Sequence, residues 1–450
     1  MKGDIPMKKI LSLLLVVIVL LSSTALASET RTISFWYSAG GANGAVIQSL
    51  VDEFNETVGK EAGIFVDGQY QGAYTASSNK LSAAITAGDL TQLPNVVQQG
   101  AATVRRLASY EEVIKFEDLL KSGKTNMTKE MFVQNFYCSS YMQGEAIGMP
   151  FASSTILLYY NKDAFVEAGL DPEVTPKTLK ELGEYCAKLT KKNEDGSVAR
   201  YGIVLQPDSW FMSTWLCQQK VGDGHAYFAD NMDGRNGYST RTVFKEEGTM
   251  KHFLEEYLAA YEQGQWKYLS EDDAGDFAAG NVAMFIGSSS AFYSVVNAVG
   301  DKFEFGCAAV PAVDEDCLGV AAGGSSLYVL DKKNDQELAD TIFFLEYLTS
   351  AETQYKWFAQ TGYFPVNVAT YDSPELAARV EEYPQLKGGI EQLLASEPTL
   401  QEPQLGISGF DTMLSEAIID VVEGNVTIDE AIDTLTEDVD AAIEEYLSNL

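Results

Sequence analysis

Aromatic side chains stand beside glycine and small hydroxyl residues at several places in this 450-residue sequence. Aromatic rings stack on the C–H faces of sugars, while hydroxyl and backbone N–H groups hydrogen-bond polar ligand atoms. The combination favours a ligand-binding cleft, although each aromatic taken singly is more simply explained as core material. The segments with this composition are 35–37, 71–74, 210–215, 323–326 and 361–363.

The sequence motifs of common enzymes are missing. No G-x-S-x-G, H-E-x-x-H, Walker loop or G-x-G-x-x-G occurs, and only two histidines are present. Nothing marks out a glycosidase carboxylate pair among the 65 acidic residues, although the sequence does not exclude one. Segment 230–234 is a poor calcium loop, because Ala229 and Thr240 would occupy its first and twelfth positions, so we interpret it as a solvated loop. We predict a binding protein with no enzyme activity, cofactor or metal.

The charge of the chain excludes two classes of partner. Lys and Arg total 31 against 65 Asp and Glu, which gives a formal net charge of −34. Nucleic-acid binding depends mainly on cations that neutralise phosphates, and attachment to anionic lipid needs basic residues. We therefore expect neither partner.

The N-terminal residues have the form of an export signal. Lys8 and Lys9 precede an apolar run at 10–21, and residues 25–27 have the A-x-A form of a cleavage site. The run is short for a membrane span of about 20 residues, which favours a signal peptide over the alternative of a membrane anchor. We predict a signal peptide at residues 1–27 and a periplasmic or extracellular location, with Met1 or Met7 as the start. The first cysteine is Cys138, so no lipobox cysteine is available.

The five cysteines do not define a disulfide pattern. Export permits disulfides, and Cys307 and Cys317 are close enough in sequence to close a small loop. The alternative is five free, buried cysteines, and an odd count leaves at least one unpaired. The sequence leaves this choice open.

Strands alternate with helices through most of the chain. A strand at 32–37, a glycine loop and a helix from Val46 open the pattern, and a second helix spans 74–87 with Gly88 as its C-cap. Thr175-Pro176 is interpreted as the start of a helix, and 427–430 has the form of a capping box. This order predicts an α/β protein, and the length predicts two lobes. Further strands are expected at 95–99, 156–160, 201–205, 282–286, 303–310 and 326–330.

Six segments together resemble family 1 extracellular solute-binding proteins of ABC importers. Among its members, the chain is most similar to the glycerol-3-phosphate-, glycerophosphodiester- and sugar-binding ones. The segments that carry the resemblance are 149–155, 158–165, 168–172, 322–327, 344–348 and 360–366.

The resemblance implies a two-lobe clamshell, the type II periplasmic-binding-protein fold, in which a mostly parallel sheet flanked by helices forms each lobe. It places residues 28–154 plus 306–349 in lobe one and 155–305 plus 350–450 in lobe two. The implied function is to capture a carbohydrate, polyol or glycerol-phosphate-like solute by hinge closure and to deliver it to ABC permease subunits. We expect a monomer.

The resemblance also implies a set of ligand-binding residues, with two departures from the family pattern. Gln404 stands where relatives have an Arg that meets phosphate, and Gln98 and Gln99 stand near the position of a Glu. Because Gln cannot give phosphate a charge-assisted contact, we expect an uncharged ligand. The expected ligand-binding residues are Trp36, Tyr74, Gln98, Gln99, Ser153, Ser154, Trp210, Trp215, Ser288, Ser289, Gly324, Tyr363 and Gln404.

Two alternatives to solute transport remain at this stage. One is a secreted carbohydrate-active enzyme, which would turn over a glycoside. The other is a ligand sensor, which would report occupancy to a receptor.

Overall fold

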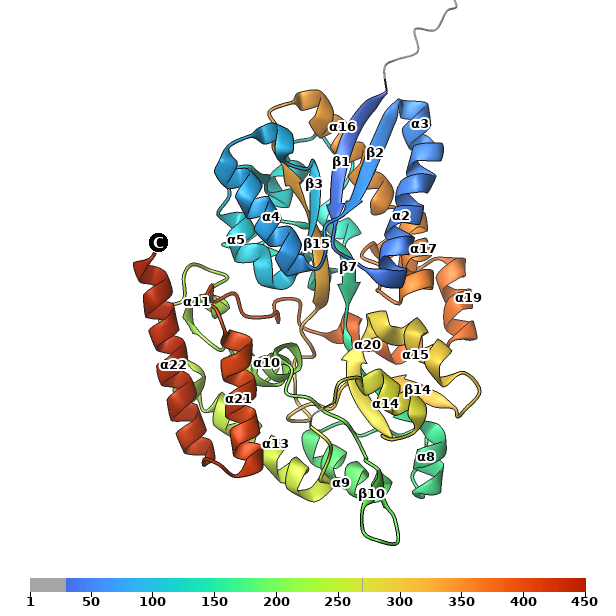
Figure 1. The fold of residues 1–450 in the computed structure, drawn as a ribbon, viewed down its shortest axis with the longest axis vertical. Helices are drawn as coiled ribbons and strands as arrows, with labels where there is room; N and C mark the ends of the chain where they lie inside the picture. The colour runs from blue at the N-terminus through green and yellow to red at the C-terminus, as the bar shows by residue number, and fades with distance from the viewer. Residues whose placement is uncertain (1–29, 269) are drawn as a thin grey trace, which may run out of the picture.

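The computed structural model describes residues 30–268 and 270–450. Figure 1 shows two α/β lobes, one above the other, with β7 and β15 leading down from the upper lobe toward the lower. The predicted signal peptide at 1–27 lies outside the described residues. Of the helices that are described, none combines the length and the apolar character that crossing a bilayer requires.

The upper lobe is built on a mixed sheet of six strands. Its order is β2-β1-β3-β15-β4, and β7 also pairs with β15. β1 runs parallel to β2 and β3, whereas β15 runs antiparallel to β3, β4 and β7. The strands are β1 (Arg31–Tyr37), β2 (Ile64–Tyr70), β3 (Val96–Gly100), β4 (Val113–Ile114), β7 (Met149–Ser154) and β15 (Gly323–Leu330).

Helices cover this sheet, and the sequence located several of them correctly. The helix predicted at 74–87 is α4, and Gly88 ends it in the left-handed conformation with φ 68°. The buried residues of α2 recur on one face, which is why this segment forms an amphipathic helix against the sheet. The helices are α2 (Gly41–Glu56), α3 (Val58–Ala62), α4 (Tyr74–Ala87), α5 (Val104–Ala108), α6 (Phe116–Lys121), α7 (Gln134–Cys138), α16 (Asp335–Leu348) and α17 (Ala351–Thr361).

The lower lobe has a small antiparallel sheet of order β13-β8-β14. The expected strand at 201–205 forms only isolated bridges, from Tyr201 and Val204. The expectation that each lobe contains a mostly parallel sheet is wrong for the lower lobe, where β13 and β14 both run antiparallel to β8. The reason is that strands which cross between the lobes run antiparallel to the strands beside them. The strands are β8 (Ile156–Asn161), β13 (Met284–Ser288) and β14 (Phe305–Ala308).

Helices make up most of the lower lobe. The helix expected at Thr175-Pro176 begins instead after Thr178, because the Thr178 hydroxyl accepts a hydrogen bond from the Glu181 N–H. The capping box at Thr427 is confirmed. The helices are α8 (Lys162–Glu167), α9 (Leu179–Leu189), α10 (Ser209–Cys217), α11 (Asp230–Asp233), α12 (Phe244–Glu247), α13 (Thr249–Gly264), α14 (Asp273–Ala279), α15 (Phe292–Val299), α19 (Pro374–Glu382), α20 (Leu386–Ala395), α21 (Phe410–Glu423) and α22 (Ile428–Ser448).

Two segments lie with a different lobe from the one expected. β14, expected in lobe one, pairs with β8 of the lower sheet. The segment of α17 and α18 (Val368–Tyr371), expected in lobe two, packs against the upper lobe, α17 on α2 and α18 on residues 129–131. Both segments lie next to points where the chain crosses between the lobes. Near such a point, the spacing of residues in the sequence does not show with which lobe a helix or strand packs. The remaining lobe boundaries stay a prediction.

The buried side chains form three clusters. One is continuous through the hinge, since it joins Phe35 and Phe54 of the upper lobe to Tyr159 and Phe285 of the lower. A second lies in the lower lobe around α10, α13 and α22, and a third lies in the upper lobe around Trp36. The two lobes therefore share one core, and each lobe also has a core of its own. All five cysteines are free, including Cys307 and Cys317.

Candidate functional site

Aromatic and hydroxyl side chains from both lobes meet at the hinge. Tyr74 is the first residue of α4, and its phenol lies beside Ser325 of β15 and close to Tyr363. Burial, with Tyr363 nearby, raises the pKa of Tyr74 well above its usual value. Tyr363 lies beside the hydroxyl of Ser290, from the lower lobe, and stacks on Trp357 with ring centroids 5.4 Å apart. These neutral phenols form a group that can stack on a ring and donate hydrogen bonds.

Two glycines of β15 allow other groups to lie close to the backbone beside these side chains. A Cβ on Gly323 would lie 2.4 Å from the Trp210 ring, and the Trp210 Nε1–H donates to the Ala321 carbonyl at 3.2 Å. Gly324 has φ +108°, and a Cβ there would lie 2.0 Å from the Ala152 carbonyl oxygen. Trp210 and Gly324 therefore occupy the same region as Tyr74 and Tyr363, at the point where β15 enters the upper sheet.

The predicted serines lie along the hinge strands. Ser153 and Ser154 pair with Gly324 and Gly323 of β15, and the Ser153 carbonyl accepts the Phe364 N–H at 2.8 Å. Ser288 Oγ accepts the Ser290 N–H, which shapes the turn after β13. The remaining serine, Ser289, is fully buried, and its Oγ accepts the Thr155 N–H at 3.3 Å. Ser288 is thus partly accessible, whereas Ser153, Ser154 and Ser289 are buried.

Gln98 and Gln99 lie in β3, next to β15, and have no exposed surface. The Gln98 amide accepts the Ser38 N–H at 3.0 Å and donates to the Ser325 hydroxyl at 2.9 Å. The Gln99 amide donates to Ser77 Oγ at 2.8 Å. Their amides therefore hold the glycine loop, β15 and α4 in position.

Two of the three predicted cleft tryptophans are core residues in this structure. Trp215 is 1% exposed, donates from Nε1 to the Pro311 carbonyl and packs against Phe253 and Tyr257. The prediction that Trp215 is a cleft aromatic is wrong, because its side chain lies in the buried cluster of the lower lobe. Trp36 is also buried, although the Lys80 ammonium lies 4.4 Å from its ring centroid.

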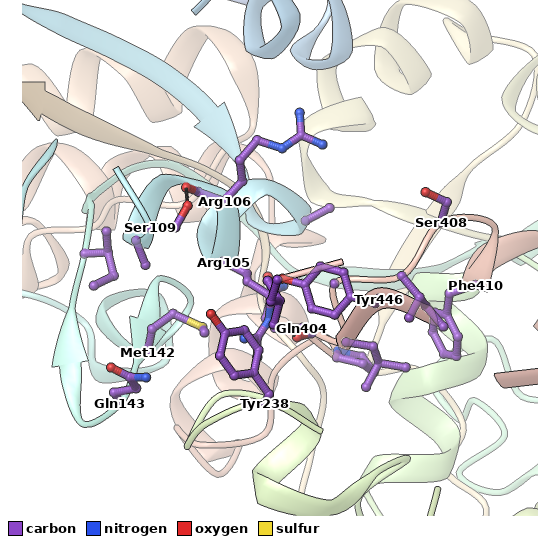
Figure 2. Close-up of a pocket in the computed structure, with 18 of the residues that line it drawn as sticks. Arg105, Arg106, Ser109, Met142, Gln143, Tyr238, Gln404, Ser408, Phe410 and Tyr446 are labelled. Atoms are coloured by element: carbon purple, nitrogen blue, oxygen red, sulfur yellow. Dashed lines mark hydrogen bonds between the residues drawn. The ribbon is translucent and has the colours of Figure 1, made fainter. Parts of the chain in front are cut away.

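A separate cavity of about 450 Å³ lies between the lobes, with Gln404 in its wall. The other predicted ligand-binding residues do not line it. The side-chain amide of Gln404 donates to the Ala101 carbonyl at 3.0 Å, and the backbone carbonyl of Gln404 accepts from Arg105 Nε at 2.6 Å. Figure 2 shows Arg105 and Gln404 together, with the rings of Tyr238 and Tyr446 beside them. The position that lacks the family arginine therefore has another arginine against its backbone.

Segment 230–234 is not the solvated loop that we expected. Asp233 is 2% exposed, and its carboxylate accepts the Ala229 N–H at 2.6 Å. Burial raises the pKa of Asp233 to about 7. The segment turns inward because residues 231–233 all have positive φ, which places Arg235 in the interior too. Within the described part of the chain, no group of three or more potential ligands is arranged to hold a metal ion.

Arg105 and Arg235 are the residues that sequence reasoning missed. Each lies between the lobes and hydrogen-bonds backbone carbonyls. Carbonyl partners leave no trace in the sequence, because every residue has one. The only available signal was the scarcity of arginine, of which the chain has seven.

Comparison with known proteins identifies the family. Residues 49–388 match the family model described as bacterial extracellular solute-binding protein, so the chain belongs to that family. It is 28% identical over 425 residues to the sn-glycerol-3-phosphate-binding periplasmic protein UgpB of Escherichia coli K12, with 91% of this chain and 92% of the relative covered. The same protein of Salmonella typhimurium is 28% identical over 431 residues, with 93% of each chain covered.

Solved structures show the same two-lobe fold. UgpB from Mycobacterium tuberculosis, in complex with glycerophosphocholine, superimposes with a TM-score of 0.71 at 19% identity, covering 92% of this chain and 99% of that one. The sugar-binding protein MalE from Xanthomonas citri gives 0.74 at 22% identity, covering 92% and 98%. The predicted fold class and the function as a solute-binding protein are thereby confirmed.

Proposed function

We propose that this protein captures an uncharged, hydroxylated solute, a sugar or polyol, and delivers it to the permease of an ABC importer. The observation that carries the ligand class is the group formed by Tyr74, Ser290, Trp210 and Tyr363 at the hinge. Their ring faces and hydroxyl groups suit a sugar, and none of these four side chains carries a charge at neutral pH. No bond is made or broken in this function.

The arrangement of the lobes supports capture by closure. Tyr74 and Ser325 belong to the upper lobe, whereas Ser290 and Trp210 belong to the lower one. A solute that contacts both sets binds the closed form better than the open form, and so shifts the population toward closure. The closed surface would then be recognised by the permease. Export through cleavage after Ala27, without a lipid anchor, and a monomeric state are parts of the same proposal.

A glycerophosphodiester is the second candidate ligand. The UgpB relatives bind glycerol phosphate by name, and one neighbouring structure holds glycerophosphocholine. In this chain, Arg105 and Arg106 line the cavity beside Gln404, so cations are present although residue 404 is not one.

Isothermal titration calorimetry distinguishes the two ligands. We expect maltose or a related sugar or polyol to bind, and Trp210→Ala to weaken that binding with little change in melting temperature. Tighter binding of glycerol-3-phosphate or glycerophosphocholine than of every sugar tested would overturn the uncharged ligand. Turnover of a glycoside by the purified protein would overturn the assignment as a binding protein.

A further inference from the structure

Three of the seven arginines form no ion pair with a carboxylate among the described residues, and all three lie near the boundary between the lobes. Arg31, Arg200, Arg241 and Arg379 each form an ion pair. Arg105, Arg106 and Arg235 form none within the described ranges, in a chain with twice as many acidic as basic residues. The carboxyl groups of Asp233 and Glu402 lie near Arg235 without forming an ion pair with it. In so acidic a protein, arginines between the lobes that bind carbonyls instead of carboxylates call for an explanation.

Arg105 belongs to the upper lobe and donates to the lower one. It lies on α5, whose Val104 and Leu107 are buried in the upper-lobe cluster around Trp36. Its Nε donates to the Gln404 carbonyl at 2.6 Å, and its Nη2 donates to the carbonyls of Gly234 and Gly237, the latter at 2.9 Å. All three acceptors lie in the lower lobe.

Arg235 makes the reciprocal connection. It follows Phe228 and Ala229, which are buried in the lower-lobe cluster. Its Nη1 donates to the upper-lobe carbonyls of Ser139 and Tyr141 at 3.2 and 3.1 Å, while its Nε and Nη2 both donate to the Glu402 carbonyl of its own lobe. Its own carbonyl accepts the Gln143 N–H at 2.6 Å.

We infer that Arg105 and Arg235 form a reciprocal clasp that holds the lobes together without a ligand and so determines how much of the protein is closed. Arg105 connects two cores that are otherwise separate, since α5 belongs to the upper-lobe cluster around Trp36 and Leu405, next to the acceptor Gln404, belongs to the lower-lobe cluster. Opening of the lobes about the hinge would therefore separate Arg105 from its carbonyl partners, whereas it would only bend the hinge strands.

Carbonyl partners suit a contact that must open. Burying a guanidinium removes it from water at a cost, and burial accordingly lowers the pKa of both arginines. Charge-assisted hydrogen bonds to carbonyls offset much of that cost, whereas opening returns both sides to water. The balance leaves the open and closed forms close in free energy, so that a bound solute can decide between them.

The inference rests on the proposed function in one respect, that closure of the lobes serves to capture a solute. The test of the inference needs no solute. Small-angle X-ray scattering of the ligand-free protein compares wild type, Arg105→Ala and Arg106→Ala. Arg106 is the matched control, because it is adjacent, exposed and donates only to Ser78 of its own lobe. We expect Arg105→Ala to have a larger radius of gyration, while Arg106→Ala matches wild type.

Arg235→Gln is the second variant, and melting temperatures show whether each variant is folded. If Arg235→Gln does not fold, Arg105→Ala alone carries the test, because Arg105 is only partly buried. Identical scattering of Arg105→Ala and wild type would overturn the clasp, as would an equal expansion of Arg106→Ala.

Affinity gives an independent readout once maltose or glycerophosphocholine is found to bind. Loss of the clasp should raise the apparent Kd by the same factor by which it lowers the closed fraction, roughly tenfold for a net loss of about 1.4 kcal/mol. If no sugar, polyol or glycerophosphodiester binds, the ligand proposal fails while the scattering result still stands.

Discussion

The buried carboxyl group of Asp233 should make the stability of this protein fall as the pH rises. Burial raises its pKa from 3.8 to about 7 in the folded chain, and the groups that face it are Arg235, Cys217 and the N–H groups of Phe228 and Ala229. Between these two pKa values the folded state holds a proton that the unfolded state has released. Raising the pH through this window therefore favours unfolding, and the full cost is present above pH 7.

The size of the effect follows from the separation of the two pKa values. A separation of about three pH units corresponds to at most about 4 kcal/mol, since each unit is worth about 1.4 kcal/mol. Glu402 also has a pKa raised to about 7 by desolvation, but part of its surface stays accessible. The prediction therefore rests on Asp233, which is 2% exposed.

Urea unfolding of wild type and Asp233→Asn between pH 5 and pH 8 measures this contribution. The amide keeps an oxygen that can accept the Ala229 N–H, so the variant removes the titration and retains the contact. Wild type should lose about 2–3 kcal/mol relative to the variant across this range, because only the two pH units from 5 to 7 fall inside the window between the two pKa values. Asp230→Asn, three residues earlier and partly exposed, is the control and should follow wild type. A difference between wild type and Asp233→Asn that does not change with pH would refute the reasoning.

Four substitutions separate core, hinge and capping roles. Trp215→Ala should cost about 3–5 kcal/mol of unfolding free energy in urea titrations, whereas Trp210→Ala should cost much less; equal costs would contradict their placement. Gly324→Ala should lower the melting temperature and weaken solute binding, because its Cβ would lie 2.0 Å from the Ala152 carbonyl oxygen; a wild-type melting temperature would refute this. Thr427→Ala should cost about 1 kcal/mol in urea titrations by removing the N-cap of α22, with solute affinity unchanged; a change in affinity would count against it.

The sequence located local structure well where local rules decide it. The helix at 74–87 and its Gly88 C-cap follow from apolar spacing and from the freedom of glycine at positive φ. The capping box at Thr427 depends only on residues within one turn. At 175–178 two local signals competed, and the hydroxyl of Thr178 became the N-cap instead of Thr175.

The candidate site was only partly predictable for a different reason. Tyr74, Trp210 and Tyr363 stand far apart in the chain, yet they approach one region because β15 and the hinge turns bring their segments together. Trp215, five residues after Trp210 on the same helix, faces the opposite way into the core. Composition alone could not separate these two tryptophans.

The sequence by itself determined the α/β class and the family, because apolar periodicity and long motif runs are properties of consecutive residues. Only the tertiary structure decided which polar groups are buried and what they bind. Arg105 and Arg235 show the physical reason, since their partners are backbone carbonyls of the opposite lobe, and a carbonyl becomes a specific acceptor only when folding has placed it.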